Sequence, residues 1–473
     1  MIPAPNAYSP VRHPEVALQR RDLVLTKMHD RGHLGADALA VAKAQPLQLR
    51  GLEPSRVRRA PYAVDLAVDA AEHTLGEGAL ATGGFQVHTS VQPLWQRAAE
   101  EAVASGLDAL IADHPDARGA QVALVAVRIA DGAVVALVGG RSYATSPFNR
   151  ASAARRQAGS TVKPFTLLAG LDAGLFTPAT RLDDRPITRT FDGTRWTPRN
   201  YDGQFVGDIT VRRAIETSRN IPAVLMAEAV GPARLQRMTR AAGLDESTNL
   251  PSAALGGYPV TPLQLAGAYT VFHDGSVRRP RLVSAIREAS GEQVIAFPSE
   301  QQRLASEQAA AQALSVLQGV MTDGTGRSAA RYGVTGAAGK SGTTDGYRDA
   351  WFAGLTPELA VAVWVGRDEG TLGLSGSRAA LPIWARFVAA SGTSGGSFRR
   401  PEGLEAVTLC SESGRLAVDA CPATYDDLFP TGDLPDDRCD LHGAPLPKVG
   451  RLLGRLFGRK HDDGATEPAP ASP

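Results

Sequence analysis

Residues 122–138 read VALVAVRIADGAVVALV, so two apolar runs flank the dipeptide Asp131-Gly132. An Asp-Gly pair between two such runs is a strong signal for a β-hairpin. Both runs are apolar at nearly every position, which is typical of strands that are buried on both faces. The stretch therefore predicts a hairpin inside a sheet that helices cover on both sides.

The segments beyond the hairpin complete the predicted fold. From about residue 160 to 330 the pattern is mostly helical, and strands return at 349–354 and 359–365. The predicted helices span residues 165–173, 211–217, 222–229, 261–274 and 306–321. Strands at both ends of a helical region predict an α+β domain whose sheet gathers the two ends.

The flanking regions differ from this domain in composition. Residues 1–50 predict helices, and residues 51–118 predict a connecting module with a strand over 83–91 and a helix over 94–111. After about residue 396 the chain becomes rich in Gly, Ser, Pro and Cys. From residue 460 the tail is polar and rich in Pro and Ala, which predicts disorder.

The overall composition narrows the classes of partner. The 473 residues have a net charge of +1 and 6% aromatic residues, so neither charge nor base stacking indicates a nucleic-acid partner. No run reaches the ~18 apolar residues of a membrane span. The first residues also lack the charged region and apolar stretch of a signal peptide.

Lysine is rare in this chain. Lys and Arg together number 50 and only six are lysines, which leaves 50 − 6 = 44 arginines. An arginine cannot give up its proton in a protein, whereas a buried lysine can, and it then serves as a general base. Two of the six, Lys163 and Lys340, lie in short motifs with hydroxyl side chains.

The first motif is Ser160-Thr161-Val162-Lys163, at the predicted start of a helix. Residues at i and i+3 share one helix face, so Ser160 and Lys163 are expected to lie close together. A serine hydroxyl needs an adjacent base to act as a nucleophile. A lysine in a water-poor cleft beside a second cation can be that base, and Lys340 is the expected second cation.

The second motif is Ser218-Arg219-Asn220, at a break between two predicted helices. From such a turn, Ser218 could pass a proton and Asn220 could hold a substrate amide. Ser247-Thr248-Asn249 matches the same short pattern but lies in a polar loop. The position between helices favours Ser218.

The third motif is Lys340-Ser341-Gly342-Thr343-Thr344, after a run of small residues. Small residues predict a strand that another backbone or a ligand approaches closely. A cation and several hydroxyls would suit a substrate carboxylate there. The backbone N–H groups of Thr343 and Ser160 could form an oxyanion hole.

The three cysteines, Cys410, Cys421 and Cys439, all lie in the last 64 residues, and His442 follows Cys439 after two residues. Three Cys and one His could bind zinc, although no C-x-x-C pair is present. A Cys410–Cys421 disulfide in an oxidising compartment is an equally consistent interpretation. The sequence therefore assigns no metal and no cofactor.

In the order S-x-x-K, S-x-N and K-[ST]-G, the three motifs match a set known from penicillin-binding proteins and class A β-lactamases. Further segments extend the match: 149–160, 255–263, 324–327 and 349–354. The chain resembles the transpeptidase domain of class A penicillin-binding proteins, which are bifunctional peptidoglycan transglycosylases and transpeptidases. The resemblance covers roughly residues 119–395, and the segment from Cys410 to His442 is similar to a C-terminal extension of some members.

The resemblance implies a fold and a mechanism. The fold would be a serine β-lactamase-like domain with a central antiparallel sheet flanked by helices. Ser160 would attack the D-Ala-D-Ala bond of a peptidoglycan stem peptide, and an amine of a second stem would resolve the acyl-enzyme. Lys163 would activate Ser160, while Ser218, Asn220 and Lys340 would relay protons and position the peptide. The substrate-binding residues would be Ser341, Gly342, Thr343 and Thr344.

The resemblance also implies a domain order. We expect a remnant of a glycosyltransferase domain at 1–58, a linker module at 59–118, the transpeptidase domain at 119–395, an extension at 396–445 and a basic, then disordered, tail at 446–473. The family's membrane anchor and glycosyltransferase glutamates would lie before residue 1, so we expect this polypeptide not to polymerise glycan. The expected location is the periplasm, and the expected partners are stem peptides, lipid II-derived glycan strands and β-lactam antibiotics.

Three alternatives remain open from the sequence. With water as acceptor, the same fold gives a carboxypeptidase or a β-lactamase; the latter needs a carboxylate, and Glu216 lies near the second motif. A non-catalytic peptidoglycan-binding protein would not need all three motifs. Separately, the Arg- and Leu-rich segment 449–460 is consistent with a short membrane-surface helix or with a solvated basic tail.

Overall fold

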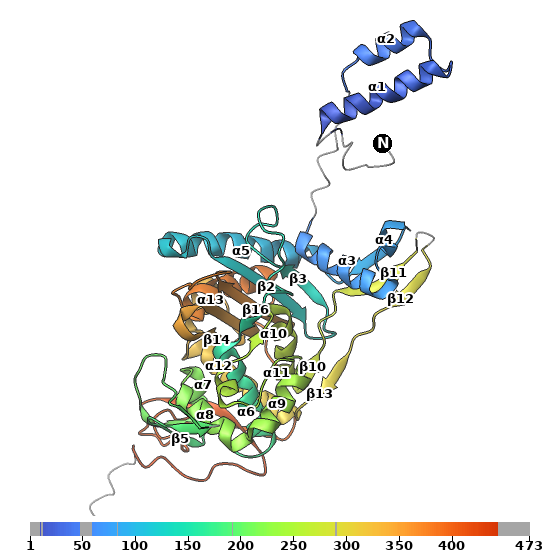
Figure 1. Ribbon diagram of the computed structural model, residues 1–473. Helices are drawn as coiled ribbons and strands as arrows, with labels where there is room; N and C mark the ends of the chain where they lie inside the picture. Colours follow the sequence, from blue (N-terminus) through green and yellow to red (C-terminus); the bar gives the residue numbers. More distant parts are fainter. Residues whose placement is uncertain are drawn as a thin grey trace, which may run out of the picture. The chain divides into compact units, whose positions relative to one another are not determined.

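The computed structural model describes residues 10, 13–47, 59–82, 84–191, 193–288 and 291–442 (Figure 1). The chain divides into two compact units between Arg59 and Ala60. The first unit contains α1 (Pro14–Asp30) and α2 (Ala36–Ala44), which confirms the predicted helices. The Arg21 guanidinium on α1 donates to the carbonyls of Lys43 and Gln45 at 2.9 and 2.6 Å, which ties the end of α2 to α1.

The second unit is built around a five-stranded antiparallel sheet. Its strand order is β14-β15-β16-β2-β3, so strands from both ends of the domain meet in one sheet, as predicted. The strands are β2 (Gln121–Arg128), β3 (Val134–Val138), β14 (Ala338–Thr343), β15 (Asp349–Leu355) and β16 (Leu359–Gly366). The hairpin predicted from residues 122–138 is β2–β3, and β14 is an edge strand.

Each face of this sheet lies in its own hydrophobic core. Ala123, Val125 and Val127 of β2 belong to one core, and the alternate residues Val122 and Leu124 belong to the other. Helices α5 (Pro93–Asp113) and α13 (Gly376–Ser391) pack on the second core, while α6 (Lys163–Asp172), α10 (Pro262–Tyr269) and α12 (Glu307–Thr322) contribute to the first (Figure 1). The prediction that helices cover both faces is confirmed.

The middle of the domain departs from the mostly helical prediction, because short strand pairs separate its helices. The remaining helices are α3 (Pro61–Leu75), α4 (Ala79–Thr82), α7 (Val211–Glu216), α8 (Asn220–Val230), α9 (Pro232–Ala241) and α11 (Val271–Asp274). The strands are β1 (Gln86–Thr89), β4 (Arg156–Gln157), β5 (Arg181–Asp184), β6 (Arg189–Phe191), β7 (Thr194–Trp196), β8 (Gly207–Thr210), β9 (Pro259–Val260), β10 (Ser276–Arg278), β11 (Val283–Arg287), β12 (Gln293–Ala296) and β13 (Gln301–Arg303). β1 falls within the strand predicted over 83–91, whereas the other strands of this group have two to five residues and are too short to show a period of two in the sequence.

The single helix predicted over 261–274 is two helices, α10 and α11, joined at Thr270. The Thr270 hydroxyl donates to the Gly267 carbonyl at 2.6 Å and accepts from the Arg278 N–H at 2.8 Å. The predicted start is confirmed, since Thr261 and Gln264 form a reciprocal capping box there. The buried hydroxyl therefore connects the helix break to β10.

A two-stranded hairpin, β17 (Leu404–Cys410) and β18 (Thr424–Pro430), forms the last described part of the chain. The Gln312 side chain on α12 donates to the Leu428 carbonyl at 2.8 Å, which joins the hairpin to the helical layer. All three cysteines are free, so the structure contains no Cys410–Cys421 disulfide. The segment 449–460 lies outside the described residues.

Among the described residues, no helix has both the length and the apolar composition that crossing a bilayer requires.

Candidate active site

Ser160 lies in a short 3-10 segment, η2 (Gly159–Val162), which runs directly into α6 at Lys163. Pro164 falls in the first turn of α6, where its missing N–H has no helical partner. A buried hydrogen bond holds this segment in place, because the Tyr269 hydroxyl donates to the Thr161 carbonyl at 2.6 Å. Ser160 itself is partly exposed, so the predicted nucleophile is presented at a rigid helix start.

Glycines let η2 lie directly against strand β14. A Cβ on Gly342 would lie 2.7 Å from the Thr161 methyl carbon and 3.1 Å from the Ala158 carbonyl. Gly159 has a φ of 56°, in the left-handed region that favours glycine, and a Cβ there would lie 3.0 Å from the Thr343 carbonyl. A backbone segment therefore lies close to the third motif, as predicted. That segment is η2, which contains Ser160 of the first motif.

The Lys163 amine is fully buried and bonded to the second motif. It donates to the Ser218 carbonyl at 2.8 Å, the Arg219 carbonyl at 3.0 Å and the Asn220 side-chain oxygen at 2.6 Å. Among the described residues, no hydrogen bond joins it to the Ser160 hydroxyl. Catalytic hydrogen bonds often tighten only when substrate is bound. The Lys163 amine thus bonds the turn at 218–220, while the Lys163 backbone N–H donates to the Ser160 carbonyl.

Ser218 lies between the two buried lysine amines. It occupies the turn between α7 and α8 with a φ of 60°, in the left-handed region that is rare for residues other than glycine. Its hydroxyl accepts from the Lys340 amine at 2.8 Å and lies 3.5 Å from the Lys163 amine. Ser247, in contrast, is buried against the Thr239 hydroxyl. The geometry therefore favours Ser218 over Ser247, as the sequence did.

Burial depresses the pKa values of both lysines, and neighbouring charges add to the effect at Lys163. Burial lowers the pKa of Lys163 well below its usual range, the nearby Lys340 and Arg219 lower it further, and Asp184 opposes them. Burial also lowers the pKa of Lys340, to about 7. Both amines therefore lose a proton more readily than an ordinary lysine, and Lys340 does so near neutral pH.

A supporting layer of polar residues holds the second motif in place. The Arg219 guanidinium donates to the buried Asp184 carboxylate at 2.8 Å. The Asn200 side chain accepts from the Asn220 N–H at 2.7 Å and donates to Asp184 at 2.7 Å. Asp184 and Asn200 could not be predicted from the sequence, because no local pattern marks them and they reach the turn only through the tertiary fold.

Strand β14 directs the third motif to both faces of the sheet. Residues opposite each other in an antiparallel pair point to the same face, so Lys340 shares the face of Ala353, on the side of the first core. Ser341 and Thr343 lie opposite Phe352 and Ala350, on the side of the second core. The predicted group of one cation and several hydroxyls is therefore divided between the two faces of an edge strand.

The hydroxyls of the third motif already have protein partners. The Ser341 hydroxyl donates to the Thr325 hydroxyl at 2.7 Å, and the Thr343 hydroxyl accepts from the Gly376 N–H at 3.1 Å. Thr344 is buried in the turn after β14, where its hydroxyl accepts from the Asp349 N–H at 3.0 Å. The Thr344 hydroxyl therefore stabilises the turn. Ser341 and Thr343 are the better candidates for binding a substrate.

The Thr343 N–H points toward η2. The Thr344 N–H donates to the Asp349 carbonyl at 3.1 Å, and N–H groups alternate in direction along an antiparallel strand. The Thr343 N–H therefore faces away from β15, toward the free edge. A Cβ on Gly159 would lie 3.4 Å from that nitrogen, so the edge amide and the Ser160 segment adjoin each other.

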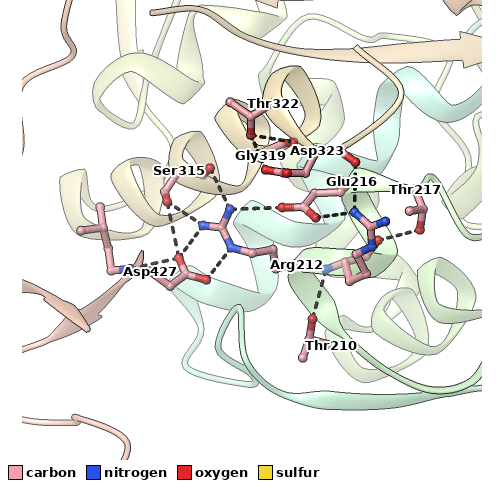
Figure 2. A network of polar contacts seen from close by, with 11 residues as sticks. Thr210, Arg212, Glu216, Thr217, Ser315, Gly319, Thr322, Asp323 and Asp427 are labelled. Atoms are coloured by element: carbon pink, nitrogen blue, oxygen red, sulfur yellow. Dashed lines mark hydrogen bonds and ion pairs between the residues drawn. The ribbon is translucent and has the colours of Figure 1, made fainter. Parts of the chain in front are cut away.

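Glu216 is engaged in a separate network of buried charges (Figure 2). Its carboxylate accepts from Arg212 at 3.3 Å and from Arg213 at 3.2 Å, and burial raises its pKa. Arg212 also forms a two-pronged pair with Asp427 of β18, at 2.7 Å for each bond. These contacts give Glu216 a structural role in holding the hairpin and α12 to α7.

Comparison with known proteins adds an independent observation. Residues 122–387 match the penicillin-binding protein transpeptidase domain, and residues 400–444 match the C-terminal domain of penicillin-binding protein 1A. The chain is 30% identical over 463 residues to penicillin-binding protein 2D of Bacillus subtilis, covering 94% of this chain and 65% of the relative. It is 31% identical over 415 residues to penicillin-binding protein 1B of Vibrio cholerae, covering 86% of this chain and 52% of the relative.

A solved structure agrees in fold. Penicillin-binding protein 1A from Haemophilus influenzae superposes with a TM-score of 0.79 at 21% identity, over 92% of this chain and 85% of that one. The chain spans between about half and two thirds of the length of the two curated relatives above. With the transpeptidase model matching more than half of its residues, the chain belongs to the penicillin-binding protein transpeptidase family, among the class A members.

Proposed function

We propose that this chain is a D,D-transpeptidase that cross-links peptidoglycan stem peptides through an acyl-enzyme on Ser160. The observation that supports it most directly is the Ser218 hydroxyl, which lies between the buried amines of Lys163 and Lys340. That arrangement supplies a base and a path for protons beside a partly exposed serine at a helix start. It is the machinery that acyl transfer to a serine requires.

In the proposed first half-reaction, the Ser160 oxygen attacks the carbonyl carbon of the D-Ala-D-Ala bond. The hydroxyl proton passes to the neutral Lys163 amine, whose depressed pKa makes the neutral form available. The N–H groups of Thr343 and Ser160 would hold the negative oxygen that develops. When the C–N bond breaks, the Ser218 hydroxyl passes its proton to the departing D-Ala nitrogen and takes one from the protonated Lys163 amine, which becomes neutral again.

In the second half-reaction, the amine of a neighbouring stem peptide attacks the ester carbon. One proton of that amine returns to the Ser160 oxygen as the ester bond breaks, so the enzyme is regenerated and a new amide forms. Asn220, bonded to both Lys163 and the Arg199 carbonyl, is placed to position the peptide. Ser341 and Thr343, which share one face of β14, would bind the terminal carboxylate, and Lys340 on the other face would help to relay protons.

We infer that β-lactams acylate Ser160 in place of the stem peptide, and that the chain acts outside the cytoplasmic membrane, where peptidoglycan is found. Hydrolysis of a β-lactam would need a carboxylate that activates water. Glu216, the candidate from the sequence, accepts hydrogen bonds from two arginines instead. This contact favours transfer to an amine over rapid hydrolysis.

A fluorescent penicillin tests the proposal. We expect stable labelling of the chain that is lost in Ser160→Ala and retained in Ser152→Ala, a matched change outside the three motifs. Rapid loss of the label would instead indicate a β-lactamase. The absence of labelling in the unaltered chain would contradict the acyl-enzyme itself and favour a binding protein.

A further inference from the structure

The C-terminal hairpin brings four metal-ligating side chains together. Cys410 ends β17, Cys421 precedes β18, and Cys439 and His442 follow β18. Their ligand atoms, three Sγ and one imidazole nitrogen, all lie within 4.8 Å of one another. The residues come from three separate places in the sequence, so the fold of the hairpin, and not local spacing, creates the cluster.

The dimensions of the cluster suit a tetrahedral zinc ion. Zinc–sulfur bonds of ~2.3 Å and zinc–nitrogen bonds of ~2.0 Å place neighbouring ligands about 3.5–3.8 Å apart. The His442 Nδ1 lies 3.3 Å from the Cys410 Sγ and 3.4 Å from the Cys439 Sγ. Small outward shifts of these three atoms would accommodate the ion.

The backbone holds the ligands in rigid turns. The Cys410 N–H donates to the Arg415 carbonyl at 2.8 Å, and the Gly414 N–H returns a bond to the Cys410 carbonyl at 2.9 Å. The Cys439 N–H donates to the Leu416 carbonyl at 2.8 Å, and this bond holds the Cys439 thiol near the Cys410 thiol. The Val418 N–H donates to the Cys421 sulfur at 3.3 Å, so that this sulfur is held as an acceptor.

A carboxylate behind the imidazole gives an independent sign of metal ligation. The His442 Nε2 lies 3.3 Å from a Glu412 carboxylate oxygen, while its Nδ1 faces the thiols. A proton on Nε2 leaves the Nδ1 lone pair directed at the cluster. Metal-bound histidines usually have such a carboxylate partner, which fixes the tautomer and makes the ring a better ligand.

We propose that Cys410, Cys421, Cys439 and His442 bind one structural zinc ion. Four protein ligands complete the tetrahedron, so the ion would have no open position for catalysis and would act as a cross-link. It would join the end of β17 to the chain that follows β18. The alternative to zinc binding is a disulfide between Cys410 and Cys421, which would remove two of the four ligands.

The test uses the full chain, purified without added chelator and analysed for metal by mass spectrometry. We expect one zinc per chain, and an intense Co²⁺ spectrum of the tetrahedral thiolate type when cobalt replaces it. The three thiols should resist a thiol reagent until a chelator removes the metal. The melting temperature should fall with chelator.

Three variants sharpen the test. His442→Ala should lose the zinc and the effect of chelator on melting, whereas His442→Cys should retain both, because it restores a fourth ligand. Glu412→Ala should weaken zinc binding by about tenfold or more through loss of the partner carboxylate. Glu405→Ala, which removes another exposed carboxylate of the same hairpin segment, should leave the affinity unchanged.

Several outcomes would overturn the proposal. One is a chain whose three thiols react freely and bind no Zn²⁺ after reduction. Another is His442→Ala with full zinc content and an unchanged Co²⁺ spectrum, which would place the metal elsewhere. A disulfide that re-forms in the presence of excess Zn²⁺ would assign the cysteines to that alternative.

Discussion

The two lysines of the site are buried amines whose hydrogen bonds, within the described ranges, all go to uncharged oxygens. Lys163 bonds carbonyls and an amide, and Lys340 bonds the Ser218 hydroxyl and the Ser341 carbonyl. Such an amine loses its hydration and gains no negatively charged hydrogen-bond partner, so its neutral form is favoured. The proposed chemistry of this site depends on amines that are buried and easily become neutral. An arginine at either position would stay charged.

The first prediction at this scale concerns Lys163→Arg. A guanidinium stays protonated and cannot accept the Ser160 proton, so we expect the rate of penicillin acylation to fall by about 100- to 10,000-fold. Stopped-flow acylation or timed labelling measures it. Lys27→Arg, on the exposed face of α1, is the matched control and should acylate normally. A normal rate in Lys163→Arg would remove Lys163 as the base.

The second prediction concerns the pH dependence of acylation. Lys163 works as a base when neutral, so the rate should fall on the acid side as pH drops through the pKa of Lys163. The charge of Lys340 lowers that pKa. In Lys340→Met the pKa of Lys163 should rise and the acid limb of the profile should move to higher pH.

Lys340→Arg is the control for this prediction, because it keeps a positive charge beside Lys163. Its acid limb should stay near that of the unaltered chain, even if the rate is lower throughout. If Lys340→Met lowers the rate without moving the acid limb, the two amines do not interact through their charges.

At the scale of elements, the site depends on how closely η2 lies against β14. The third prediction is therefore that Gly342→Ala displaces the Ser160 segment, since its Cβ would meet the Thr161 methyl carbon at 2.7 Å. We expect a loss of about 1–3 kcal/mol in the free energy of unfolding. Misplacement of the nucleophile should slow acylation by about 10- to 100-fold.

Gly432→Ala is the matched control, because a Cβ there has open space around it and the backbone is outside the left-handed region. Thermal denaturation and penicillin labelling should both leave Gly432→Ala close to the unaltered chain. Equal behaviour of the two alanine variants would contradict the argument from close packing.

The elements that the sequence predicted well are those with a strong local pattern. Strands β2, β3, β15 and β16 have long apolar runs, and α12 has a capping serine, Ser306, which accepts from the Ala309 N–H as expected. The short polar pairs β5–β8 and β6–β7 were missed: β6 and β7 are neighbours of only three residues each, too short to show alternation, and β5 and β8 lie far apart in the sequence. The same limit applies to Asp184 and Asn200.

The three motifs could be found from the sequence because the reactive side chains of each motif lie within a few residues of one another. The arrangement of the motifs in space could not be predicted. Nothing local indicates that Lys163 bonds the turn at 218–220, or that Lys340 and Ser341 point to opposite faces of β14. These are consequences of sheet register and of helix packing.

At the scale of the whole second unit, a buried ion pair joins the C-terminal hairpin to the helices, in addition to the bond from Gln312 to the Leu428 carbonyl. Arg212 and Asp427 have 8% and 0% of their side chains exposed, and two bonds of 2.7 Å connect them. Arg212 lies on α7, the helix that leads into the turn of Ser218. The hairpin is therefore part of the support for the active site.

The fourth prediction is that Asp427→Ala lowers the free energy of unfolding by about 3–5 kcal/mol, because it leaves the Arg212 charge buried without its main partner. Asp426→Ala, one residue away and exposed, should change it by no more than about 0.5 kcal/mol. Chemical denaturation of both variants measures the difference. A small effect of Asp427→Ala would mean that the hairpin is held chiefly by other contacts.

The edge position of β14 has a consequence for the protein in solution. One side of β14 pairs with β15, and in the described chain no strand pairs with its other side. An unpaired edge accepts any extended backbone, whether it is a peptide ligand or a second copy of the same sheet. If part of this edge receives the extended backbone of the proposed peptide substrate, the same unpaired groups also give the protein a tendency to self-associate at high concentration. A bound peptide or β-lactam that covers the edge should raise the concentration at which aggregates appear, in addition to any effect on unfolding.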